Sequence, residues 1–408
     1  MSEHSNVRRS SMQHRRLPKA ARRWRAVALA AATVVMVASS CTPPPPQPPQ
    51  SGIQLVGSDS GSGWKYDYFL NYDAPCSESG FQSFLVATAL GSDPSASAPL
   101  WTFLHGGGAG YYDSSGDPMP SATNKRQESP QQLKNKLVGG LVGQAKNSPT
   151  GYRFLAVSMC SHDTYAGFNT PDPNNDKPTT GLAHTMAAIS WVQTHYPTDD
   201  VVLHGGSAGS VGTFHVGYWM QSHGQAPTAI VADSAVINKA WQEAQNSIGQ
   251  FLPNGSLNEC FRPPAAMSAI PARWDPLFQT DDDQGHLRLQ SGQLTVPVMH
   301  VWSTNDSNQC GARLMSCTLP NGSVVTMGST ECNNAPIHDV ISHLPAARHS
   351  VDFEVCVDKP GAGYPEDCDW HVPTQTDGTN SNVAPGDPAA DYNRFVLDWV
   401  EARVAATP

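Results

Sequence analysis

Apolar runs and segments of helical periodicity alternate along most of the chain. Continuous apolar runs typical of buried strands cover residues 84–90, 100–105, 154–160, 201–207, 229–236 and 296–306. Apolar residues recur every three or four positions in the segments predicted as helices, which are 133–145, 180–197, the segment after residue 207 that contains Val211, Phe214 and Trp219, and 391–404. This alternation predicts an α/β fold, with a mostly parallel sheet covered by helices on both faces. In such sheets active sites lie at the carboxyl ends of the strands.

Segments rich in Pro, Gly, Asn and Asp separate these elements and are interpreted as loops. They cover residues 111–130, 168–179, 252–265, 280–286 and 373–388. No internal repeat is visible, so the loops are expected to be insertions on one scaffold. We therefore predict a single catalytic domain over residues 63–408, a size that open α/β enzymes reach.

The first 40 residues are predicted to be an export signal. A basic region, residues 8–25, precedes an apolar stretch, residues 26–38, that is short for a membrane span. Small residues then lead to Cys41, the candidate for lipid attachment in a lipoprotein-type signal. The alternative is an ordinary signal peptide with an incidental cysteine. Residues 41–62, rich in Pro, Gly and Ser, are predicted to be a linker. We expect an exported protein, either a cell-surface lipoprotein or secreted.

Charge and cysteine content narrow the choice of partners. Residues 1–40 hold eight basic residues and one acidic residue, which leaves 17 basic and 34 acidic residues and a formal charge of −17. Such a domain is not expected to bind nucleic acid, and a membrane contact is expected only through Cys41. Eight further cysteines favour disulfides in an exported chain, with the pairing left open. Their spacings fit no zinc module, and no metal or cofactor is expected.

The segment VVLHGGSAGSVG, residues 201–212, contains the pattern G-x-S-x-G centred on Ser207. It follows a predicted strand and precedes a predicted helix, the context of a nucleophile elbow. A tight turn without chemistry is the alternative. A serine nucleophile also needs a base, an orienting acid and donors for the oxyanion. The donors are expected from Gly107 and Gly108, in the glycine run after the strand 100–105, and from Ala208.

Six short blocks resemble the pectin acetylesterase/Notum family of α/β-hydrolase carboxylesterases. In chain order they are FLHGGGAG, VSMCSHDTYAG, LHGGSAGSVG, VADSAV, STNDSNQ and CDWH, spread over about residues 63–400. Ser210 stands where the family has a second glycine. Ala109-Gly110-Tyr111 replaces a Trp and Cys, and Asn308 replaces a Trp. These departures concern the substrate pocket and one disulfide.

The resemblance implies a triad of Ser207, Asp306 and His371 on an α/β-hydrolase fold. The order Ser, acid, His along the chain is that of this fold. Asp306 directly follows the strand 296–305, and Asp233 is its main rival because it also ends a strand. His371 lies in a loop that contains Cys368, whose disulfide could hold the imidazole. The alternatives for the base are His338, His343 and His349.

We therefore expect an exported serine carboxylesterase that hydrolyses acetyl or other short-chain esters, with an acylated polysaccharide as a candidate substrate. One alternative is a lipase or polyester-type hydrolase on the same fold. The other is a surface lipoprotein that binds a partner and has no catalytic activity.

Overall fold

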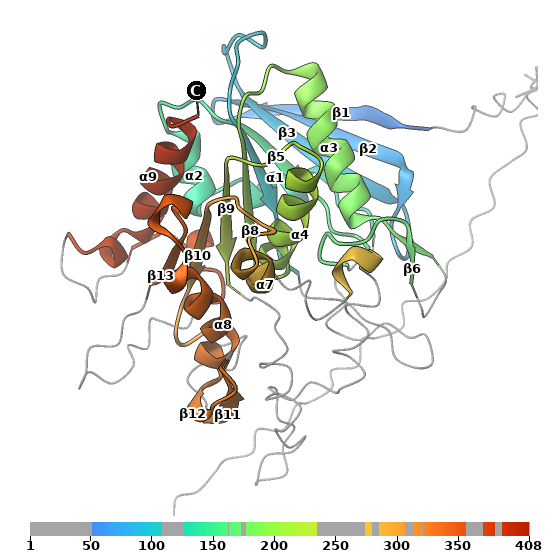
Figure 1. Ribbon diagram of the computed structural model, residues 1–408. Coiled ribbons are helices and arrows are strands. Elements are labelled where there is room, and N and C mark those ends of the chain that lie inside the picture. Colours follow the sequence, from blue (N-terminus) through green and yellow to red (C-terminus); the bar gives the residue numbers. More distant parts are fainter. Residues whose placement is uncertain are drawn as a thin grey trace, which may run out of the picture. The chain divides into compact units, whose positions relative to one another are not determined.

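A nine-stranded mixed sheet forms the centre of the chain (Figure 1). The computed structural model describes residues 51–107, 126–161, 163–172, 177–234, 274–279, 285–306, 314–319, 321–355, 370–379 and 386–407. In sheet order the strands are β1 (Ile53–Gly61), β2 (Trp64–Pro75), β3 (Phe81–Ala89), β5 (Arg153–Val157), β4 (Leu100–Leu104), β8 (Val201–Gly206), β9 (Ala229–Asp233), β10 (Val298–Trp302) and β13 (Val351–Glu354). The six strands from β5 to β13 are parallel, and β1 to β3 are antiparallel. The predicted mostly parallel sheet is confirmed.

Helices cover both faces of the sheet, as predicted. The helices are α1 (Pro130–Lys136), α2 (Gly140–Lys146), α3 (Gly181–His195), α4 (Ala208–Ser222), α7 (Gly285–Gln290), α8 (Ser329–His343) and α9 (Tyr392–Val404). Side chains of α1, α2 and α9 pack with Trp101, Phe103 and Val231 on one face. Those of α3, α4, α7 and α8 pack with Leu104, Leu203 and Ile230 on the other. The strands alternate between the two cores because successive side chains point to opposite faces.

The predicted linker 41–62 is wrong over its last part. Residues Ile53–Gly61 form β1, which pairs antiparallel with β2 at the edge of the sheet. Much of β1 is exposed, so its sequence is polar and rich in Gly and Ser and has the composition of a linker. Backbone hydrogen bonds to the apolar strand β2 hold β1 in the sheet. The sequence analysis did not predict β2 either. The described domain therefore begins about ten residues before the predicted boundary.

The helix predicted over 133–145 is two helices. Between α1 and α2 the chain passes through Gly139 and Gly140, which have φ values of 77° and 54°. A right-handed helix cannot continue through such residues, and glycine adopts them at little steric cost. Leu133, Leu141 and Val142 still reach the same core, because both short helices lie on one face of the sheet.

A group of elements after residue 314 was not predicted. It consists of the hairpin β11 (Leu314–Thr318) and β12 (Val324–Gly328), then α8. A disulfide between Cys317 and Cys332 joins β11 to α8. The remaining short elements are the hairpin β6 (Thr170–Pro171) and β7 (Pro178–Thr179), and the 3₁₀ turns η2 (Pro276–Phe278), η5 (Ala346–Arg348), η6 (Pro373–Gln375) and η7 (Pro388–Ala390).

The carboxyl ends of four neighbouring parallel strands bring polar residues to one edge. In the register, Leu104 of β4 pairs with Gly205 of β8, and Gly206 pairs with Asp233 of β9. The residues that follow these positions therefore meet above the same edge of the sheet. Ser207 directly follows β8, and Asp306 comes shortly after β10.

Candidate active site

Ser207 occupies the sharp turn between β8 and α4. Its φ is 54° and its ψ is −121°, in a region that residues other than glycine rarely adopt. Its backbone N–H donates to the carbonyl oxygen of Asp233 at 2.9 Å, which ties the turn to the neighbouring strand. Strained backbone of this kind persists where the surroundings fix it, often at functional sites. The strand, turn and helix together have the form of a nucleophile elbow.

The glycines on either side of Ser207 leave room for this turn. A Cβ on Gly209 would lie 1.8 Å from the carbonyl oxygen of Leu104, and one on Gly205 would lie 2.1 Å from that of Gly209. Both neighbours are backbone atoms, which cannot move aside as the end of a side chain can. The pattern G-x-S-x-G is therefore a steric requirement of the elbow in this chain.

The imidazole of His371 lies between Ser207 and Asp306. Its Nε2 is 2.7 Å from the Oγ of Ser207, and its Nδ1 is 2.8 Å and 3.0 Å from the two carboxylate oxygens of Asp306. An ionised carboxylate only accepts hydrogen bonds, so Nδ1 carries the hydrogen and Nε2 presents a lone pair to the serine hydroxyl. This is the geometry that a general base needs.

The side chains of Asp306 and His371 differ in how deeply they are buried. The Asp306 side chain is fully buried, whereas 23% of the His371 side chain is exposed. The Asp306 N–H donates to the carbonyl of Ser303 at 3.2 Å, and the Thr330 hydroxyl donates to the Asp306 carbonyl at 3.4 Å. These bonds hold the backbone of Asp306 in place inside the protein, and the imidazole of His371 remains partly exposed.

The glycine loop after β4 runs directly past the elbow. A Cβ on Gly106 would lie 2.8 Å from the Cβ of Ser207. Gly107 follows in this loop with a φ of 152°. Ala208 is the first residue of α4, where a backbone N–H has no intrahelical acceptor. The predicted donors Gly107 and Ala208 therefore come from segments that meet at Ser207, and Gly108 lies outside the described residues.

A buried pair that the sequence analysis missed anchors this loop. The Nδ1 of His105 lies 2.6 Å from the carbonyl oxygen of Gly106, and its Nε2 lies 2.7 Å from the carboxylate of Glu128. His105 therefore bridges the backbone of the glycine loop to the carboxyl group of Glu128. Burial raises the pKa of Glu128, but the charge and hydrogen bond of His105 outweigh this and leave the pKa below its usual value. Glu128 lies in a segment predicted only as a loop.

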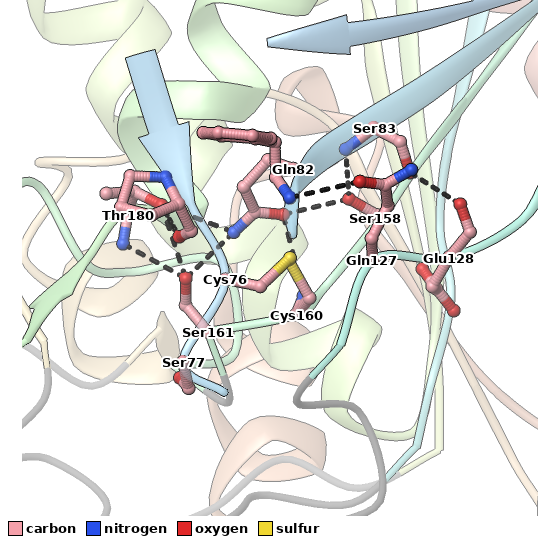
Figure 2. The surroundings of a disulfide bond; sticks show 12 residues. Cys76, Ser77, Gln82, Ser83, Gln127, Glu128, Ser158, Cys160, Ser161 and Thr180 are labelled. Carbon is pink, nitrogen blue, oxygen red and sulfur yellow. Dashed lines mark hydrogen bonds between the residues drawn. A yellow bond between two sulfur atoms is a disulfide. The ribbon is translucent and has the colours of Figure 1, made fainter. Parts of the chain in front are cut away.

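The disulfide between Cys76 and Cys160 lies beside this anchor (Figure 2). The Met159 N–H donates to the Glu128 carboxylate at 3.3 Å, one residue before the disulfide. The buried amide of Gln82 donates to Ser161 and accepts from Ser158, both at 2.8 Å (Figure 2). The disulfide and these hydrogen bonds therefore fix the chain just after β5. Met159, which donates to Glu128, lies in this fixed segment.

The rival acid, Asp233, has a different partner. Its Oδ2 accepts hydrogen bonds from the backbone N–H of Thr374, at 2.8 Å, and from the Thr374 hydroxyl. Burial raises the pKa of Asp233 to about 7, against the lowering effect of these bonds. Asp306, and not Asp233, contacts the imidazole of His371.

The other candidate bases make contacts elsewhere. His338, on α8, lies 2.7 Å from Asp352, whose hydrogen bond raises the pKa of His338. His343 bonds to the carbonyl of Asp339 in its own helix. His349 is the C-cap residue of η5. Of the four histidines considered from the sequence, the structure places His371 against Ser207.

Within the described residues, no group of three or more His, Cys, Asp or Glu side chains could hold a metal ion. A search of the same residues finds no helix long and apolar enough to cross a membrane. Cys41, the apolar segment 26–38 and the cysteines 260, 310, 356 and 368 lie outside them.

Three features identify the architecture. They are the strand order of the sheet, the elbow after β8, and the order Ser207, Asp306, His371 along the chain. The chain has the α/β-hydrolase fold. This confirms the fold expected from the sequence.

Comparisons with known proteins find similarity at a low level, and among solved structures alone. No family model and no curated protein matches the sequence. Among solved structures, the chain resembles brefeldin A esterase, a bacterial homologue of human hormone sensitive lipase, at 11% identity and a TM-score of 0.43, over 86% of this chain and 81% of that one. It resembles carboxyl esterase 2 from Tuber melanosporum at 12% identity and a TM-score of 0.44, over 88% and 92%.

A third similar structure is prolyl oligopeptidase B from Galerina marginata, at 10% identity and a TM-score of 0.40. The match covers 84% of this chain but only 37% of that protein. At these identities the likeness does not bear on which bond is cleaved.

Proposed function

We propose that the protein is a serine carboxylesterase that uses Ser207, His371 and Asp306. The observation that carries the proposal is the continuous hydrogen-bonded line from the Ser207 hydroxyl through His371 to Asp306. A serine hydroxyl is a weak nucleophile at neutral pH, and this line provides the base and the orienting acid it lacks.

In the first half-reaction, the Ser207 oxygen attacks the ester carbonyl carbon and its proton passes to Nε2 of His371. Asp306 holds the ring and stabilises the resulting imidazolium. Backbone N–H groups of Gly107, Gly108 and Ala208 hold the oxyanion of the tetrahedral intermediate. The intermediate collapses to an acyl-enzyme when His371 passes the proton to the departing alkoxide. Water, activated by the same imidazole, then releases the acid and regenerates Ser207.

The proposed substrates are esters of acetate or other short acids, with an acylated polysaccharide as the candidate. The resemblance of six blocks to the pectin acetylesterase/Notum family supports this choice. The formal charge of −17 outside residues 1–40 argues against tight binding of long polyanions. We further propose that the protein is exported, and the disulfides Cys76–Cys160 and Cys317–Cys332 support an oxidising compartment. Lipid attachment at Cys41 is part of the same proposal.

Hydrolysis of p-nitrophenyl esters of increasing acyl length tests the substrate class. The full-length, oxidised protein is expected to cleave the acetate ester fastest and to release acetate from an acetylated polysaccharide. The Ser207→Ala variant provides the blank for both assays. A rate that rises with acyl length would favour the lipase alternative. A folded protein that cleaves none of these esters would favour the binding lipoprotein.

A further inference from the structure

We propose that Asp233 and Thr374 form a clamp that positions the loop of His371 over Ser207. The clamp would make Thr374 a positioning residue, three residues beyond the histidine. This inference rests on the proposed function, because it concerns how the base is kept at reacting distance.

Two donors of Thr374 converge on one oxygen of Asp233. The backbone N–H and the side-chain hydroxyl of Thr374 both bond to Oδ2, from the start of η6. Both side chains are buried. Two hydrogen bonds to one buried carboxyl oxygen restrict both the backbone and the side chain of Thr374. The loop is thereby fixed to the carboxyl end of β9.

His204 of β8 also bonds to the Thr374 hydroxyl, and its other partner shows which atom donates in each bond. The indole N–H of Trp101 points to Nδ1 of His204, at 3.3 Å, and Nε2 of His204 lies 2.9 Å from the Thr374 hydroxyl oxygen. An indole N–H only donates, so Nδ1 accepts and Nε2 carries the hydrogen. The Thr374 oxygen therefore accepts from His204 and donates to Asp233. Burial lowers the pKa of His204 to about 3, so the ring is neutral, as this pattern requires.

Apolar packing does not surround the loop on all sides. A cavity of about 450 Å³ borders it, lined by Phe103, His204, Thr374, Gln375 and residues of α1 and α2. On the sheet side, Val372 stands against Gly206, where a Cβ would lie 2.7 Å from the Val372 side chain. The backbone of Thr374 also packs against Gly140 of α2. Such van der Waals contacts have no direction, whereas the clamp supplies directional bonds that fix Thr374 relative to β9.

The position of this loop matters because the reacting contact is short. His371 Nε2 lies 2.7 Å from Ser207 Oγ, and Asp306 bonds only to the far side of the ring. Asp306 therefore sets the orientation of the imidazole, whereas the clamp sets the place of its backbone. A displacement of about 1 Å at a reacting group can lower a rate about 100-fold.

The test replaces the Thr374 hydroxyl by a methyl group and compares kinetics with a matched control. Thr374→Val removes the hydroxyl's bonds to Asp233 and His204 at nearly constant volume and leaves the backbone N–H bond to Asp233 in place. Thr102→Val makes the same change on β4, where the buried hydroxyl has no hydrogen-bond partner in the described structure. Thr374→Ser keeps the hydroxyl and provides the conservative rescue. We measure kcat, KM and Tm with p-nitrophenyl acetate.

We expect Thr374→Val to lower kcat about 10- to 100-fold with KM nearly unchanged, because substrate contacts are untouched. Thr374→Ser should recover most of kcat, and Thr102→Val should behave as the wild type. Equal kcat in both valine variants would overturn the clamp, as would a loss confined to KM. If Thr374→Val does not fold, Thr374→Ala and Thr102→Ala repeat the comparison. An inactive wild type would instead refute the proposed function.

Discussion

His371→Ala should lower kcat on p-nitrophenyl acetate by about 10⁴-fold or more while the protein stays folded. The imidazole is the only side chain that the described structure places between Ser207 and a carboxylate, at 2.7 Å from the hydroxyl. Without it the serine proton has no acceptor when the nucleophile attacks. The partly exposed ring contributes little to the core, so Tm should change little.

His343→Ala is the matched control for this variant. His343 is exposed on α8, where it bonds to Asp339 of the same helix. Its removal should leave kcat and KM unchanged. Strong residual activity of His371→Ala, or an equal loss in His343→Ala, would remove His371 from the proposed triad.

Gly209→Ala should prevent the elbow from forming and destabilise the domain by about 3 kcal/mol or more, at the upper end of overpacking effects. The new methyl carbon would stand 1.8 Å from the Leu104 carbonyl oxygen, so β4 and α4 cannot both keep their places. We expect little soluble protein, and a lowered urea midpoint in what is recovered.

Gly143→Ala is the control for this substitution. Gly143 lies inside α2, and a Cβ there would meet nothing within 4 Å. Because alanine favours a helix over glycine, this variant should gain about 0.5–1 kcal/mol of unfolding free energy. A soluble, fully active Gly209→Ala protein would show that the turn does not have the geometry described.

The sequence predicted the parts of the site that follow strands or carry local patterns. Ser207 and Asp306 each come shortly after an apolar run, and parallel strands bring their carboxyl ends to one edge. His371 lies 65 residues after Asp306, in a loop, and only the family resemblance and the nearby Cys368 distinguished it from His338, His343 and His349. Gly108, Cys41 and Cys368 lie outside the described residues, so predictions that depend on them stay predictions.

The residues that support the site could not be predicted in this way. Glu128 and Thr374 are polar residues in segments predicted as loops, and their partners His105 and Asp233 lie 23 and 141 residues away. A hydrogen bond between distant loop residues leaves no periodicity or spacing to detect. The edge strand β1 was not predicted for a related reason. Its pairing with β2 is made by backbone groups, which any residue supplies. The break at Gly139 and Gly140, by contrast, was visible in the sequence.

Covalent labelling of Ser207 tests the central claim most directly. The full-length, oxidised protein is incubated with a fluorophosphonate, digested and analysed by mass spectrometry, beside the Ser207→Ala and His371→Ala variants. We predict one phosphonyl group on the peptide that contains Ser207, slow labelling of His371→Ala, and none at this peptide in Ser207→Ala. A wild-type protein that is folded but unlabelled at Ser207, or labelled there as fast without His371, would contradict the account.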